Sequence, residues 1–134
     1  MNWKSASIAF VVILVLDLIW FKFVAGRFYL EQVTGIGRIS EGAFAPVIWA
    51  ALVVYLCLGI GAGTFVDPLV RQADSLWAVA CIGSLFGFVV YGVYDFTNLA
   101  ILKDWPLKLV LVDVAWGSFI NAVAALAIRW AAGK

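Results

Sequence analysis

Histidine is absent from this sequence of 134 residues, and charged side chains are scarce. The missing imidazole excludes haem ligation by histidine, histidine-based zinc sites and Ser-His-Asp triads. Charged residues make up 13% of the chain and hydrophobic residues 66%. A soluble domain carries roughly 25% charged residues on average, so this chain lacks the polar surface that such a domain needs.

The few charges nearly cancel, and cysteine occurs only twice. The formal net charge is +1, and no nucleic-acid partner is expected because such binding needs a clustered basic face. Cys57 and Cys81 both fall inside apolar runs. We interpret them as two small buried hydrophobic residues rather than as a disulfide.

Four long apolar runs cover residues 5–25, 44–66, 76–102 and 107–128. Each has the roughly 20 residues that a helix needs to cross about 30 Å of hydrocarbon. A backbone within lipid must satisfy its own hydrogen bonds, which favours helices. We therefore predict an all-α fold, an integral membrane four-helix antiparallel bundle. It forms a single transmembrane domain over residues 1–134, with both termini on one side.

Three short connections join these runs. The first, residues 26–43, contains several glycines and is expected to be a loop, as are residues 67–75 and 103–106. The nine basic residues divide five to four between the two sides of the membrane. This bias encodes the orientation weakly, and it slightly favours termini on the outer side.

Small residues predict where the helices approach one another. Gly59-x-x-x-Gly63 and Gly83-x-x-x-Gly87 each place two glycines about one turn apart, which lets backbones come close. Together they favour a tight contact between the second and third spans. The tryptophans at span ends are expected to be interfacial anchors; they are Trp3, Trp77, Trp105 and Trp130.

Three carboxylates lie inside the predicted spans, at Asp17, Asp95 and Asp113. Each costs about 2.5–3.5 kcal/mol at a helix centre on insertion scales. Because alternate spans run in opposite directions, all three fall in the half of the bilayer next to the first and third connections. The structural alternative is an interhelical hydrogen bond or an ion pair, with Lys22 the nearest partner for Asp17. We favour a functional polar pocket, shared by the three carboxylates.

Polar and aromatic residues share helical faces with these carboxylates. Tyr91, Asp95 and Asn98 fall on one face by their spacing. The pattern Asp-x-x-Trp occurs at both Asp17 and Asp113 with similar flanking residues, as in the inverted repeats of some transporters. The predicted substrate- or ion-binding residues are Asp17, Asp95, Asp113, Asn98, Tyr91, Tyr94, Trp20 and Trp116.

The residue types in this set limit its chemistry. A carboxyl group among indoles and phenols either stays protonated or binds a cation, and its oxygens suit hard cations. The sequence assigns no resident metal and no cofactor. No catalytic residue is assigned either, because Ser84, Ser118 and Thr97 lack an evident base.

Several of these residues form a pattern that is similar to one bacterial family. The segments that carry the similarity are Leu16-Asp17-Leu-Ile-Trp20, Gly26-Arg-Phe28-Tyr29, Tyr94-Asp95-Phe-Thr-Asn98-Leu-Ala, Trp105-Pro106 and Asp113-Val-Ala-Trp116-Gly117. The chain resembles, over essentially its whole length, the membrane proteins grouped as domain of unknown function twenty-one seventy-seven. It departs from that pattern at Phe21, where the family is aliphatic, and its second span matches only in hydrophobic character.

The resemblance implies four helices and a multi-pass location in the bacterial inner membrane, and it supplies no activity. We favour a cation- or proton-coupled small-solute transporter. One alternative is an accessory or assembly subunit of a larger membrane complex, and another is a membrane-embedded enzyme that acts on lipid headgroups through a divalent ion. The expected partners are the lipid bilayer and a second copy or a larger complex.

Overall fold

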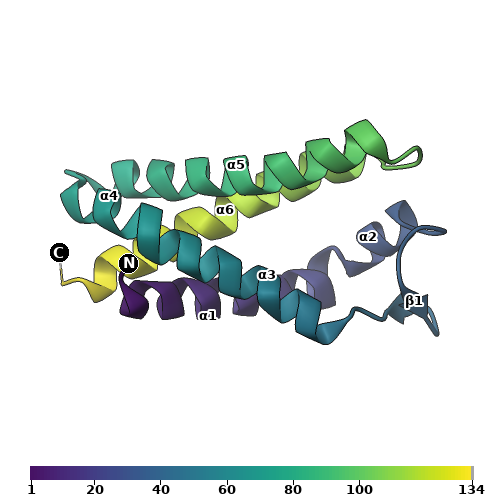
Figure 1. Ribbon diagram of the computed structural model, residues 1–134, viewed down its shortest axis with the longest axis horizontal. Helices are drawn as coiled ribbons and strands as arrows, with labels where there is room; N and C mark the ends of the chain where they lie inside the picture. The colour runs from purple at the N-terminus through teal and green to yellow at the C-terminus, as the bar shows by residue number, and fades with distance from the viewer. Residues whose placement is uncertain (134) are drawn as a thin grey trace.

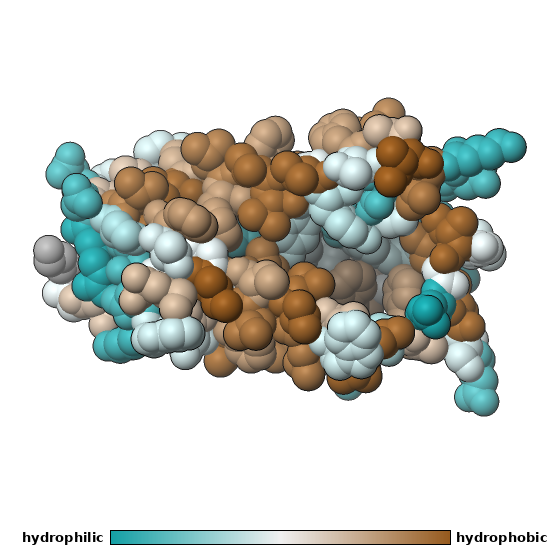
Figure 2. Space-filling model, in the orientation of Figure 1, coloured by the Kyte–Doolittle hydropathy of each residue, from teal (hydrophilic) through white to brown (hydrophobic). Residues whose placement is uncertain are grey.

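Four long apolar helices form an antiparallel bundle in the computed structural model, which describes residues 1–133 (Figure 1). The spans are Trp3–Val24, Ile48–Gln72, Leu76–Ile101 and Leu107–Ala131. Both termini lie at one end of the bundle, which we call the terminal end, and the first and third connections lie at the other, the connection end. Hydrophilic residues gather at the two ends with hydrophobic residues between them (Figure 2), as a bilayer requires. The predicted all-α membrane bundle is confirmed.

The first two spans each contain one π-helical turn. The first span is α1 (Trp3–Ile19) followed by η1 (Trp20–Val24), and the second is α3 (Ile48–Gly61), η2 (Ala62–Val66) and α4 (Asp67–Gln72). At the end of η1 the N–H of Ala25 donates to the carbonyl of Trp20 at 2.8 Å, a step of five residues. Such turns are rare and often lie near functional sites.

The second span is shifted along the sequence from its predicted position. It begins at Ile48 rather than Phe44 and extends to Gln72, so it includes residues that we expected in a loop. Pro68 does not stop the helix: it lies at the start of α4, directly after the π-helical turn η2, where the regular ladder of hydrogen bonds between residues four apart is already interrupted.

The first connection is folded, contrary to the predicted loop. It contains the helix α2 (Gly26–Gln32) and a small antiparallel hairpin of β1 (Ile39–Ser40) and β2 (Ala43–Phe44). Gly26 is needed where α2 begins, because a Cβ at this position would collide with the carbonyl oxygen of Phe21.

Glycines determine how the spans pair, but not as predicted. A Cβ on Gly83 of α5 (Leu76–Ile101) would lie 2.6 Å from Ala125 of α6 (Leu107–Ala131), and one on Gly87 would lie 2.9 Å from Asn121. The third span therefore packs against the fourth. The equivalent glycines of α3 and η2 approach the backbone of α1. The predicted tight contact between the second and third spans is wrong, because the glycine spacing marks a close approach without identifying the partner.

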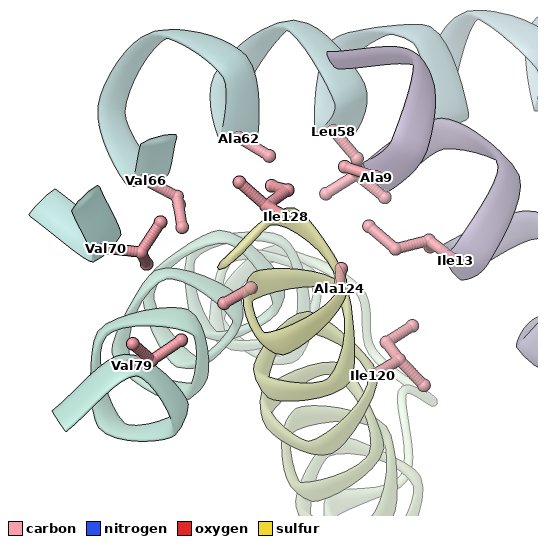
Figure 3. Packing of buried hydrophobic residues seen from close by; sticks show 11 residues of the cluster. Ala9, Ile13, Leu58, Ala62, Val66, Val70, Val79, Ile120, Ala124 and Ile128 are labelled. Atoms are coloured by element: carbon pink, nitrogen blue, oxygen red, sulfur yellow. The ribbon is translucent and has the colours of Figure 1, made fainter. Parts of the chain in front are cut away.

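The main hydrophobic core lies in the terminal half of the bundle. Figure 3 shows its side chains from different helices gathered around α6. The core contains fully buried Ile13 of α1, Val79 of α5 and Ile120 of α6, with Val70 of α4 beside them. A second, smaller cluster lies at the connection end, where Leu109 of α6 packs with residues of α2. The polar residues of the bundle lie mainly outside these two clusters.

A polar network closes the terminal end. The buried carboxylate of Asp67 accepts hydrogen bonds from Ser5 (2.5 Å), Asn2 (3.4 Å) and Arg71 (2.9 Å). The guanidinium of Arg129 donates to three carbonyl oxygens at the end of α4, the shortest at 2.7 Å. This terminal lock joins the N-terminus, the second span and α6.

Some residues that the sequence placed at the membrane surface or in the core lie elsewhere. Trp3, Trp77 and Trp130 are exposed at span ends, as expected of anchors. Trp105 instead packs edge-on against Tyr94, with ring centroids 6.0 Å apart, and its indole nitrogen is buried. Both cysteines are free thiols on exposed helix faces, rather than buried residues; they are Cys57 and Cys81.

Candidate functional site

The two Asp-x-x-Trp segments meet where α1 and α6 pack against each other. Their indoles, Trp20 and Trp116, are stacked with centroids 4.1 Å apart and planes 9° apart. The Trp116 indole also donates a hydrogen bond to the Asp17 carboxylate, at 2.7 Å. Because α1 and α6 are antiparallel, the tryptophan of the α6 segment contacts the carboxylate of the α1 segment. The contact is not reciprocal, since the Trp20 nitrogen is buried without a hydrogen-bond partner in residues 1–133.

Asp113 takes its hydrogen bond from outside the four spans. The hydroxyl of Tyr29, on α2, donates to this carboxylate at 2.6 Å. Tyr29 is buried, and its burial, followed by the charge of Asp113, raises the pKa of the phenol. The hydroxyl therefore remains a donor. The sequence placed Tyr29 in a loop, and only its occurrence in the family pattern marked it.

Asp95 faces Asp113 across the α5–α6 contact. The glycine contacts set an antiparallel register in which Tyr91 lies against Gly117. One turn further toward the connection end on both helices, Asp95 comes opposite Asp113, and the two carboxyl groups are close enough to interact directly. Asp95 is 0% exposed, and neither of its oxygens accepts a hydrogen bond from a donor among the described residues.

A cavity of about 700 Å³ opens between α3 and α5, and Figure 2 shows a recess on this face of the molecule. Its apolar wall comes mainly from α3. Its carboxyl, hydroxyl and indole groups come from all four spans; they are Asp17, Tyr55, Tyr91, Tyr94, Asp113 and Trp116. The volume is in the range of small-molecule sites.

The predicted site residues divide into two groups. Five of the eight line the cavity, whereas Asp95, Asn98 and Trp20 do not. The expectation that all three carboxylates open into one cavity is therefore wrong for Asp95, which lies behind Asp113. Asn98 is half-buried next to Tyr94. Asp17 and Asp95 are buried, and Asp113 is partly buried.

Two further observations concern the partners of Asp17. Lys22, the ion-pair partner of the structural alternative, instead lies over the ring of Phe23 at 5.3 Å. Tyr55, which sequence reasoning missed, approaches Asp17 from α3 and lines the cavity. The only signal for it was a tyrosine within an otherwise nearly hydroxyl-free span.

The grouping of acidic side chains bears on metal binding. Within the described part of the chain, no three Asp, Glu, Cys or His side chains group closely enough to hold a metal ion. The arrangement offers carboxylates, hydroxyls and aromatic faces, which together can hold a positive charge by ion pairing and by cation–π contact.

A family model described as "Predicted membrane protein (DUF2177)" matches residues 3–130. The match covers nearly the whole chain, including every residue of the cavity. No curated protein and no solved structure matches the chain.

Proposed function

The chain belongs to the family of predicted membrane proteins (DUF2177), and it is a multi-pass membrane protein. We propose that it carries an organic cation with an apolar body across the bilayer, in exchange for protons. The family description supplies the membrane location alone. The nature of the solute and the coupling are inferred from the cavity.

The observation that carries the proposal is that two carboxylates and an apolar wall line one intramembrane cavity. Asp17 and Asp113 come from different helices and can pair with one positive charge. Tyr55, Tyr91 and Tyr94 line the same space, and an aromatic ring in contact with a desolvated cation stabilises it by about 2 kcal/mol. A small hydrated ion would make no use of the apolar residues of α3, whereas the apolar body of an organic cation would pack against them.

The asymmetry of the bundle sets what transport through it would require. The carboxylates lie toward the connection end, while the hydrophobic core and the terminal lock close the other end. Release on the far side therefore needs a second arrangement of the helices, as in alternating access. The π-helical turns lie next to Asp17 and next to the terminal lock, and such turns often occur at functional sites.

The test measures binding of tetraphenylphosphonium to the purified full chain by titration calorimetry. Asp17→Asn and Asp113→Asn should each weaken binding at least about tenfold, because each removes a negative charge from the cavity. Asp104→Asn is the matched control, since it makes the same change on an exposed residue of the third connection. It should bind like the wild type.

Two further ligands test the chemical class. Neutral triphenylphosphine oxide should bind weakly because it lacks the charge, and tetramethylammonium should bind weakly because it lacks the apolar body. Equal binding by the wild type and the two carboxylate variants would reject the proposal. The accessory-subunit and lipid-headgroup alternatives remain predictions.

A further inference from the structure

Asp95 is a buried carboxyl group that the proposed cation site does not use. It is 0% exposed, it does not line the cavity, and its two oxygens have no hydrogen-bond partner within residues 1–133. A buried ionised carboxylate without a partner is costly. Its place in the bundle therefore requires something that removes its charge.

The groups that surround Asp95 supply no positive charge. Asp113 faces it from α6, Tyr29 approaches from α2, Tyr94 lies beside it on α5, and Trp105 belongs to the third connection. The nearby basic residue Lys108 lies over Phe28 instead. No salt bridge to Asp95 forms in the part of the chain that the structure describes.

The contact between Asp95 and Asp113 favours the binding of one proton by the two carboxyl groups. Two adjacent carboxyl groups form a hydrogen bond to each other only when one of them holds a proton, and the ionisation of both is disfavoured by repulsion of like charges. The buried N–H of Trp105, which also has no partner in the described residues, is a further donor next to the pair.

We propose that Asp95 and Asp113 form a proton-binding site behind the cation cavity, in which the pair shares one proton that is released when the cation binds at Asp113. This inference rests on the proposed function and specifies its coupling. The O–H bond within the pair breaks, and the proton passes to water at the connection end. The positive charge of the cation replaces the charge of that proton. The net charge of the site does not change.

The arrangement differs from a site where proton and cation compete for a single carboxylate. Asp113 belongs to both the cavity and the pair, so it contacts the cation directly. Asp95 does not line the cavity and acts through Asp113, as a positioning and proton-holding residue. An asparagine at position 95 would donate an N–H to Asp113 and keep it ionised without a shared proton.

The experiment counts the protons released per tetraphenylphosphonium bound, by calorimetry in two buffers of different ionisation enthalpy. The wild type should release close to one proton. Asp95→Asn should release almost none, and its affinity should lose the rise with pH that proton release gives the wild type. Asp17→Asn should bind more weakly yet still release a proton, because its carboxylate is outside the pair.

An infrared difference spectrum of the wild type gives a second measurement that does not depend on a variant. Binding of the cation should remove the carbonyl band of a protonated carboxyl group. Proton release that is unchanged in Asp95→Asn, or a wild type that releases no proton and keeps its carboxyl band, would overturn the inference. If Asp17→Asn and Asp113→Asn bind like the wild type, the proposed function itself fails, which is a distinguishable result.

Discussion

The close approach of α5 and α6 at Gly87 can be tested by adding one carbon atom. In Gly87→Ala the new Cβ would collide with the carbonyl oxygen of Gly117 and would lie 2.9 Å from the Cβ of Asn121. Ordinary contacts are about 3.5–4.0 Å, so the two helices must separate. Overpacking of this kind costs about 1–3 kcal/mol.

Gly92→Ala is the matched control on the same helix. No atom lies within 4 Å of its added Cβ, so it gains only the higher helix propensity of alanine, about 1 kcal/mol. Since Gly87→Ala gains the same propensity, the difference between the two variants isolates the steric cost. Denaturant unfolding in detergent, followed by the fluorescence of the seven tryptophans, measures that difference. Equal stability of the two variants would show that α5 and α6 do not pack at Gly87.

Three other expected outcomes concern single contacts. Trp116→Phe should destabilise the protein by about 1–3 kcal/mol, because the buried Asp17 loses its indole donor; a circular dichroism melt equal to that of the wild type would contradict this. Ser5→Ala should cost about 1–2 kcal/mol in the same melt, because the hydroxyl donates to the buried carboxylate of α4, and an unchanged melt would show that the terminal lock adds no stability. Saturating tetraphenylphosphonium should slow modification of Cys57 by N-ethylmaleimide, since this thiol lines the cavity, and should leave Cys81 unchanged as an internal control. Equal protection of both thiols would place the ligand elsewhere.

The spans and the depth of the carboxylates could be predicted because hydrophobic length and antiparallel order are properties of the chain itself. Asp17, Asp95 and Asp113 do lie in one half of the bundle. The residues of one helix do not identify which other helix packs against each of its faces. Gly87 was correctly expected at a helix contact, yet its partner is the fourth span and not the second.

Several contacts of the site come from residues that no hydrophobic periodicity in the sequence marks. Tyr29 reaches Asp113 only because α2 folds back over the connection end, and Tyr55 stands alone in an apolar run. Asp67 precedes a proline, which is typical of a turn, but three donors from other parts of the chain satisfy it inside the second span. Long-range hydrogen bonds of this kind cannot be read from neighbouring residues.

The hydrogen bond between Asp17 and Trp116 joins residues that are 99 positions apart, in the first and last spans. Chains are synthesised from the N-terminus, so the first span must enter the membrane before its hydrogen-bond donor exists. During that interval the Asp17 carboxyl group has no contact with α6, and lipid or the insertion machinery surrounds it. Completion of the fourth span is then the step that first gives this carboxyl group its indole donor. A chain that stops before that span would leave Asp17 with Tyr55 of α3 beside it but without the Trp116 donor.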